Sequence, residues 1–529
     1  MSAEHVEARA GAYADSVTLM RVSADVRQAE GIQAALIAMA TELNLDLLTT
    51  LGFRPPSDAS PNHLLVAVRA SDDAAISKAL AVLDSALSFR PGSGDAAISA
   101  QPPRTTGAAV RANGPGLALI SVPGRYAFAE AMDALEAGCD VMIFSDNVPV
   151  EQEIALKDVA AQRDLIVMGP DCGTAIVGGV GLGFSHTLPA GPIGLVAASG
   201  TGAQQVLCLL DYAGVGVSAA LGVGGRDLSA AVGGRSARAA LTALDADPAT
   251  ELIVVVSKPP AAAVAAGLRE FAAGLATPVQ FALISPGEPD LTTATETSLR
   301  ALGLPVPDWP RWPGAVQATG RVQAAGPGQP QESESAVARP SPERGRPAGV
   351  LRGLFAGGSL CDEAMIIATD RLGPIRSNIP LRPELRLAPR APETTVLQTT
   401  VTGHAMIDFG DDELTAGRPH PMIDQSLRLE RLAAEAADPA VTVIQLDVVL
   451  GHGAHPDPAA ELAPAIAEAR ATGRAAVVVS LIGAAADPQG LSRQAALLQQ
   501  AGADVFASNA AAARFACDLI DRDLIDGAK

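Results

Sequence analysis

Short apolar runs rich in β-branched residues alternate with Ala- and Leu-rich stretches of helical spacing through most of this chain. A run that is apolar at every position is typical of a strand whose parallel sheet is covered by helices on both faces. Strands and helices that alternate in this way favour βαβ units. We therefore predict an α/β protein with parallel sheets, whose strands include LALIS (117–121), DVMIFS (140–145), LIVMG (165–169), IGLVAAS (193–199), LIVVVS (252–257), VTVIQLDVV (441–449) and AAVVVSLIG (475–483).

The length and hydropathy of the chain indicate several domains. It has 529 residues, which is more than one hydrophobic core usually serves, and 48% of them are hydrophobic. No apolar run reaches the roughly 18 residues of a membrane helix. The N-terminal stretch MSAEHVEARA is polar and acidic, unlike a signal peptide. We expect a cytoplasmic protein that does not enter a membrane.

Charge and cysteine usage exclude two classes of function. A formal net charge of −20 gives no basic surface for nucleic acid. Backbone N–H groups at helix starts can still bind anions, and they do not register in the charge. The five cysteines form no CxxC pair, which fits a reducing compartment and argues against a zinc knuckle or a disulfide framework.

Composition divides the chain into five regions. Residues 1–105 predict a small α+β domain, with strands at 16–23 and 63–70 and helices near 26–39 and 76–87. The other four regions are an α/β domain over 106–190, a second over 191–305, a flexible linker over 306–349 and a last α/β domain over 350–529.

Two glycine turns each follow a strand and open a helix. Ser199-Gly200-Thr201 lies in the second α/β domain, and Gly357-Gly358-Ser359 lies in the last one. Small residues let a ligand approach the free N–H groups of the helix start, so we predict that these six residues bind an anionic group, a phosphate or a carboxylate. The alternative is that Ser199 or Thr201 simply caps its helix. If the two domains face each other, both helix ends could converge on one ligand.

A third turn, Gly169-Pro170-Asp171-Cys172, directly follows the run 165–169. Ligands of open α/β sheets bind at this carboxyl edge of the strands, so we predict that these four residues contact a cofactor. The chain contains neither GxGxxG nor GxxxxGK[ST], so it predicts no dinucleotide fingerprint and no Walker A loop.

The segment GHAMIDFGDDELTAGRPHPMID (403–424) concentrates ionisable residues among glycines and prolines. Three interpretations remain open. Arg418 could clamp an anion while His404 or His420 acts as general acid or base. The carboxylates could instead hold a divalent metal such as Mg²⁺, although no particular ligands stand out. The third interpretation is a solvated acidic turn whose histidines have ordinary partners.

A second histidine-bearing loop, GHGAHPDP (451–458), follows the buried run 441–449. Because it lies at the carboxyl end of a strand, we expect it to rim the same cleft as the segment 403–424. Asp447 inside that run is either a functional buried carboxylate or a partner for a loop N–H.

Several segments resemble the α subunit of succinyl-CoA synthetase. With segment 403–424 and DVVLGHGAHPDP (447–458) added at the end, the chain is similar to the FdrA family of acyl-CoA-synthetase-like proteins. The α-subunit-like segments are VPGRYAFAEAMDALEAGCDVMIFSDNVPV (122–150), GPDCGTAI (169–176), ASGTGAQQV (198–206), ALGVGGRD (220–227) and LIVVVSKPP (252–260).

The resemblance implies tandem parallel-sheet domains of the succinyl-CoA synthetase type. These are a Rossmann-like CoA-binding-type domain over 106–190 and two flavodoxin-like domains over 191–305 and 350–529, preceded by the small α+β domain. In the synthetase, the turn matching Ser199-Gly200-Thr201 holds the phosphate of a phosphohistidine. The turn matching Gly357-Gly358-Ser359 resembles the second phosphate-facing helix.

The chain departs from the synthetase pattern in three places. The stretch 284–303, where the phosphohistidine would lie, contains no histidine. There is no ATP-grasp region, and the glycine-rich opening of a CoA-binding domain is not recognisable, so CoA is not an expected cofactor.

The FdrA family includes a subunit of oxamate carbamoyltransferase. The resemblance therefore implies a carbamoyltransferase subunit that interconverts oxalurate plus phosphate with oxamate plus carbamoyl phosphate. It also implies further protein subunits, in a homodimer or hetero-oligomer, and a small acyl or carbamoyl substrate with phosphate. The alternatives are a CoA-ligase-like subunit of the succinyl-CoA synthetase superfamily and a non-catalytic scaffold or regulatory protein.

Overall fold

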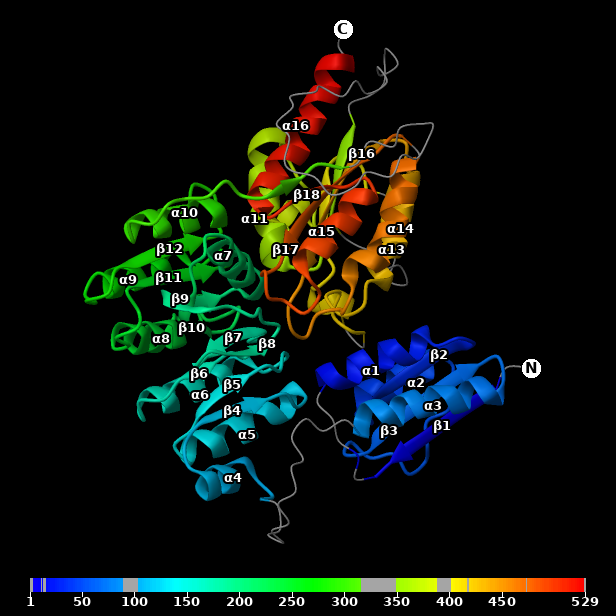
Figure 1. Ribbon diagram of the computed structural model, residues 1–529. Helices are drawn as coiled ribbons and strands as arrows, with labels where there is room; N and C mark the ends of the chain where they lie inside the picture. The colour runs from blue at the N-terminus through cyan, green and yellow to red at the C-terminus, as the bar shows by residue number, and fades with distance from the viewer. Residues whose placement is uncertain are drawn as a thin grey trace.

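The computed structural model describes residues 3–10, 12, 16–88, 103–314, 349–387, 401–415, 418–471 and 473–527. Most of the predicted linker 306–349 therefore lies outside the described residues. Figure 1 shows four α/β or α+β bodies along the chain, with the N-terminal one in blue at the lower right. The predicted α/β class with a small N-terminal α+β domain is confirmed.

The N-terminal domain is a three-stranded antiparallel sheet in the order β1-β3-β2. Helices α1 and α3 pack on one face, where Val26, Val66 and Leu83 are buried together. Leu48 and Phe53, within and just after α2, pack on the other face. Its elements are β1 (Ala3–Arg9), α1 (Ser16–Gln28), β2 (Ile32–Met39), α2 (Glu42–Thr50), β3 (Leu64–Ala70) and α3 (Asp73–Ser88).

Two predictions for this domain are wrong. Residues 16–23 are not a strand but lie in α1, where Leu19, Val22 and Val26 recur at helical spacing and form a buried face. The predicted helix near 26–39 is instead the end of α1 followed by β2. The Ala-rich run of β2 resembles a helix in composition, but pairing with β3 outweighs that propensity.

The second body is a three-stranded parallel sheet in the order β4-β5-β6. It ends near residue 170 rather than 190, because β7 (Thr174–Val177) and β8 (Val180–Gly183) form a hairpin that extends the next sheet through β10. Its elements are α4 (Thr106–Asn113), β4 (Leu117–Ile120), α5 (Gly124–Glu136), β5 (Asp140–Ile143), α6 (Val150–Ala161) and β6 (Val167–Met168).

The third body has a six-stranded sheet in the order β12-β11-β9-β10-β7-β8. Its four longer strands are parallel, and the hairpin β7-β8 adds an antiparallel edge. The remaining elements are β9 (Ala190–Ala198), α7 (Gly200–Tyr212), β10 (Val217–Gly222), α8 (Arg235–Asp245), β11 (Leu252–Ser257), α9 (Ala262–Ala272), β12 (Val279–Leu283) and α10 (Leu291–Ala301).

The last body is a second six-stranded sheet in the order β13-β18-β17-β16-β14-β15. Residues 311–312, placed in the linker by sequence, form β13 and pair antiparallel with β18. Its elements are β13 (Arg311–Trp312), β14 (Val350–Phe355), α11 (Gly358–Leu372), the 3₁₀ turn Pro383–Leu385, β15 (Ala405–Asp408), α12 (Asp412–Thr415), α13 (Ser426–Ala437), β16 (Val441–Val449), α14 (Pro458–Ala471), β17 (Ala476–Ile482), α15 (Leu491–Gln500), β18 (Asp504–Phe506) and α16 (Asn509–Gly527).

Polar contacts join these bodies. Arg27 of α1 forms an ion pair of 2.9 Å with Asp424, just before α13. In the loop that follows β8, the Nδ1 atom of His186 lies 2.7 Å from Asp487 Oδ2 in the last domain. Within the described part of the chain, no helix is both long and apolar enough to cross a membrane.

A buried charge network holds the second body to the third. Lys157 of α6 donates to Glu153 Oε1 at 2.8 Å and to Asp227 Oδ1 at 2.7 Å. All three side chains are fully buried. Asp227 follows β10 and also accepts the backbone N–H groups of Ser236 and Ala237 at the start of α8. The lysine therefore lies between two carboxylates that water cannot reach, and Arg226 pairs with the other oxygen of Glu153 at 3.0 Å.

We expect Lys157→Met to lower the free energy of unfolding by about 3–5 kcal/mol, because it leaves the buried carboxylate of Asp227 without its counter-ion and leaves Glu153 with Arg226 alone. Urea denaturation of the full chain measures the change. The matched control is Arg300→Ala, which removes a solvent-exposed ion pair with Glu296 and should change the stability by less than about 1 kcal/mol. Equal effects of the two substitutions would contradict the assignment.

Candidate functional site

The N-termini of helices α7 and α11 meet between the third and last bodies. Ser199, the N-cap of α7, accepts the N–H of Gly202 at 3.1 Å and donates to Ser359 Oγ at 2.6 Å. A methyl group added to Gly357 would lie 2.7 Å from the side chain of Thr201. The two glycine turns predicted from sequence thus lie side by side, although 160 residues separate the two serines.

The amide groups in front of α11 are held by a buried carboxylate. Asp447 of β16 accepts the N–H of Ala356 at 2.7 Å and of Gly357 at 2.8 Å. Arg428 of α13 donates to the same carboxylate at 3.1 Å. Of the two interpretations of Asp447, the structure supports a partner for loop N–H groups. The first N–H groups within α7 and α11 have no intrahelical acceptor and face the junction with a positive helix end.

Lys258 places a positive charge beside this junction. It follows β11 directly, at the carboxyl end of the strand. Its Nζ lies 3.7 Å from the position that a Cβ atom would take if Gly358 carried one, and 4.0 Å from the corresponding position at Gly225. The lysine therefore reaches from the third body to the start of α11. Sequence reasoning missed it, although a lone charged residue directly after a buried, mostly apolar strand was a visible signal.

Three carboxylates surround Lys258. Burial lowers the pKa of the lysine, but the charges of Asp171, Asp408 and Asp362 outweigh this, so its pKa is raised overall. Among the described residues, no carboxylate lies within 4.0 Å of Lys258 Nζ, so the ammonium group is not committed to one ion pair. An anionic ligand can therefore compete for it.

The same surroundings raise the pKa of the three carboxyl groups toward neutral pH. Burial raises the pKa of Asp171 to about 6, of Asp362 to about 6 and of Asp408 to about 7, while Lys258 lowers each of them. Asp171 is nevertheless accessible to solvent, and its φ of 58° is one that Asp adopts more readily than most residues. The three carboxyl groups can therefore exchange protons near neutral pH, while Lys258 stays protonated.

His420 also lies at this junction. Its Nδ1 accepts the N–H of Met422 at 3.2 Å, so its Nε2 carries the hydrogen in the neutral ring. That Nε2 lies 2.7 Å from a methyl group built on Gly410, in the turn after β15. Burial, Arg428 and Lys258 lower the pKa of His420 to about 4. The ring is therefore a neutral hydrogen-bond donor near pH 7.

One of the three predicted catalytic residues is not brought to the junction. His404 precedes β15, and its Nδ1 accepts the N–H of Leu351 at 3.0 Å. Asp408 ends the same four-residue strand, so His404 lies about 13 Å away at the opposite edge of the sheet. The prediction that His404 acts at this site is wrong, because the strand carries it to the far edge.

Arg418 is exposed, and its backbone N–H donates to Thr415 O at 2.9 Å. Within the described ranges its guanidinium makes no hydrogen bond or ion pair, and its role as an anion clamp stays a prediction.

The turn 169–172 contributes one side chain to the site. Asp171 faces Lys258 and Gly225. Its neighbours pack against the turn after β10, since a methyl group on Gly224 would lie 2.3 Å from Pro170 O. Burial raises the pKa of the Cys172 thiol to about 12, so it is no nucleophile. Binding of a cofactor by Gly169, Pro170 and Cys172 stays a prediction.

The two histidine-bearing loops do lie together. The N–H of His455 donates to Met422 O at 2.7 Å. His452 contacts Thr187 Oγ1 at 2.9 Å, and His455 lies 3.4 Å from Glu461. His452 therefore joins the third and last bodies, whereas His455 has its partners within the last body. The described residues contain no group of three or more His, Cys, Asp or Glu able to hold a metal ion, so the Mg²⁺ interpretation has no ligand set among them.

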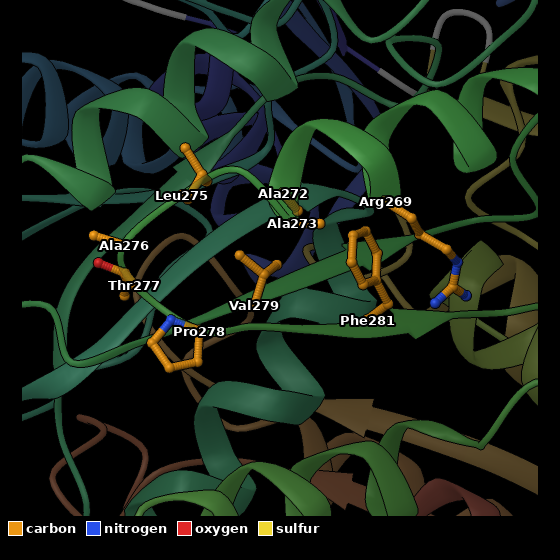
Figure 2. A pocket seen from close by; sticks show the side chains of 9 residues that line it. All are labelled: Arg269, Ala272, Ala273, Leu275, Ala276, Thr277, Pro278, Val279 and Phe281. Atoms are coloured by element: carbon orange, nitrogen blue, oxygen red, sulfur yellow. The ribbon is translucent and has the colours of Figure 1, made fainter.

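Two cavities lie away from this junction. One of about 330 Å³ opens between α9 and the start of β12, and Figure 2 shows Arg269 and Phe281 at one end of its lining. The guanidinium of Arg269 stacks over that ring and also pairs with Glu288. A larger cavity of about 640 Å³ lies between the amino edge of the β4-β5-β6 sheet and α8. Neither is lined by residues of the junction.

Comparison with known proteins supports a family assignment. A family model described as CoA-ligase matches residues 354–519, and one described as the AllF heavy metal-associated domain matches residues 1–102. The chain is 36% identical to the protein YahF of Escherichia coli (strain K12) over 507 residues, which covers 93% of both chains.

More distant similarities cover parts of the chain. It is 30% identical over 175 residues to the α subunit of the ADP-forming succinate–CoA ligase of Aquifex aeolicus, covering 32% of this chain and 56% of that protein. A solved structure of the dinucleotide-forming acetyl-coenzyme A synthetase 1 of Ca. Korarchaeum cryptofilum, with phosphate and ADP, covers 78% of this chain and 84% of that chain at 15% identity. Its TM-score of 0.25 is too low to support an argument.

The N-terminal domain does not fit the heavy metal that its family description names. All five cysteines of the chain lie at or beyond residue 139, so the domain has none. Its two histidines are His5 on β1 and His63 before β3, and no metal-ligating group forms among the described residues. Soft metals need thiolate ligands, which this domain lacks.

We expect Gly357→Ala to weaken binding of inorganic phosphate about tenfold, because the added methyl group would push Thr201 and the N-terminus of α7 away from α11. Isothermal titration calorimetry at fixed ionic strength measures the affinity. The control Gly116→Ala adds a methyl group with nothing within 4 Å and should leave it unchanged. Unaltered affinity in Gly357→Ala would show that phosphate does not bind between the helices.

Proposed function

Because this chain belongs to the FdrA family of succinyl-CoA synthetase-like proteins, we propose that it is the phosphate-binding subunit of a carbamoyltransferase. The reaction converts oxalurate and phosphate into oxamate and carbamoyl phosphate. The observation that carries the proposal is the contact between Ser199 and Ser359, which joins two helix N-termini beside Lys258. The chain acts together with other subunits in this reaction.

The charges at the junction suit an acyl phosphate. The N–H groups at the starts of α7 and α11 are oriented donors for phosphate oxygens. Lys258 adds a full positive charge from a third direction. Donors that are already in place stabilise the negative charge that develops on phosphate as a carbamoyl group leaves. Positioning of this kind requires no nucleotide.

The junction also favours direct transfer. In succinyl-CoA synthetase-like enzymes a histidine carries the phosphoryl group, but the stretch 284–303 has none. His420 lies nearby with its Nδ1 already accepting a backbone N–H. Its neutral Nε2–H can donate to the carbonyl oxygen of the carbamoyl group. Phosphate would therefore react with oxalurate while both are bound.

Assay of the chain with its partner subunits tests the proposal. Oxalurate and inorganic phosphate should yield carbamoyl phosphate and oxamate, detected by coupled assay or by ³¹P NMR. Absence of carbamoyl phosphate with every partner present would refute the proposed reaction.

Lys258→Met in the same complex should raise the KM for phosphate by at least tenfold, since it removes the charge that binds the anion, and Lys258→Arg should recover part of the loss. Lys78→Met on α3 is the matched control, because Lys78 is exposed on the N-terminal domain. A KM for phosphate that does not respond to Lys258→Met would place phosphate elsewhere.

A second candidate function is a CoA-ligase-like subunit, which the match of the CoA-ligase family model to residues 354–519 favours. The body that would hold CoA has three parallel strands, and its Gly124 turn packs against the backbone of Asp146 and Asn147. We therefore expect no heat when CoA is titrated into the complex. Micromolar binding of CoA would favour the ligase function over the carbamoyltransferase.

A further inference from the structure

Asp408 lies opposite Lys258 across the start of α11. It is the last residue of β15, at the same carboxyl edge as the glycine turn after β14. Its Oδ1 accepts the N–H of Gly410 at 2.9 Å. Its Oδ2 lies 2.6 Å from a methyl group built on Gly358, and Lys258 Nζ lies 3.7 Å from the same position. One carboxylate and one ammonium group, from different domains, therefore flank a single glycine.

Asn378 fixes the backbone of Asp408. The Asn378 Nδ2 donates to Asp408 O at 2.8 Å, and its Oδ1 accepts the Asp408 N–H at 3.0 Å. Both residues are buried, with exposed fractions of 2% for Asn378 and 5% for Asp408. A carboxamide that binds both backbone groups of one residue fixes the backbone of that residue, and so the point from which its side-chain carboxylate extends. The buried carboxamide of Asn378 therefore serves to position Asp408.

We propose that Asp408, positioned by Asn378, transfers the proton between phosphate and the oxamate nitrogen during carbamoyl transfer. The inference rests on the proposed function and assigns its acid–base residue. Asp408 would be the catalytic residue, and Asn378 a positioning residue that acts through it.

The proton and electron pairs balance in each direction. A phosphate oxygen attacks the carbamoyl carbon of oxalurate, and the bond from that carbon to the amide nitrogen breaks. The electron pair goes to the nitrogen of the departing oxamate, which takes the proton of Asp408. The proton of the attacking hydrogen phosphate then restores the carboxyl group. In the reverse direction the Asp408 carboxylate removes a proton from the oxamate nitrogen as it attacks carbamoyl phosphate.

The surroundings of Asp408 suit a group that both gives and accepts a proton. Burial raises its pKa to about 7, against the opposing effects of Lys258 and the Gly410 N–H. The titratable and charged groups that face it from the neighbouring elements are Lys258 after β11, Cys361 and Asp362 of α11, Asp411 of its own turn, His420 across Gly410 and Arg428 of α13.

Kinetics of the assembled complex test the inference. Asp408→Asn should lower kcat about 100-fold or more, as expected for loss of a general acid–base, while its affinity for inorganic phosphate changes by less than about threefold. Asp411→Asn, the same substitution three residues along the chain, is the control and should retain kcat. Full activity in Asp408→Asn would overturn the inference and leave the proposed function standing.

The pH profile gives an independent measurement on the wild-type complex. Formation of carbamoyl phosphate needs protonated Asp408, so its kcat should fall as the pH rises through about 7, and the kcat of the reverse reaction should rise. Asn378→Ala should shift this midpoint, which loss of packing alone would not do. A wild-type kcat that is flat from about pH 6 to 8 would overturn the inference even if Asp408→Asn fails to fold. Failure of the wild-type complex to form carbamoyl phosphate would instead remove the proposed function, and this inference with it.

Discussion

The hydrogen bond between Ser199 and Ser359 marks the constraint on which the site depends: two helix N-termini from separate sheets must meet end to end. Such an approach brings two partial positive charges together, so neighbouring negative groups are needed to offset them. Asp447 is one such negative group, because it accepts hydrogen bonds from two backbone amides at the α11 turn, and Asp408 lies over Gly358. The glycines are required because side chains would keep the two turns apart.

Charge balance at the junction explains why the site is suited to a small anion. Lys258 has three carboxylates around it but no committed ion pair among the described residues, and burial raises the pKa of those carboxyl groups toward neutral pH. Ligand phosphate can then replace part of this negative charge without rearranging the backbone. The buried network of Lys157, Glu153 and Asp227 shows the contrasting case, in which every charge is bonded and the result is structural.

Sequence patterns located elements and turns well where the signal was local. The runs 441–449 and 252–257 coincide with β16 and β11, and both glycine turns open helices as predicted. Patterns failed where tertiary pairing decided the outcome. The Ala-rich run 32–39 became a strand through pairing with β3, and the hairpin of β7 and β8 joined the neighbouring sheet instead of closing its own domain.

The sequence by itself determined the parallel-sheet architecture and the small residues at the helix starts, because buried strands and tight turns each need particular residue types nearby in the chain. Only the tertiary structure decided which ionisable residues share the site. Lys258 and Asp408 are 150 positions apart and meet because two sheets place their carboxyl edges face to face. His404 and Asp408 are four positions apart and separate because an extended strand carries its two ends to opposite edges of the sheet.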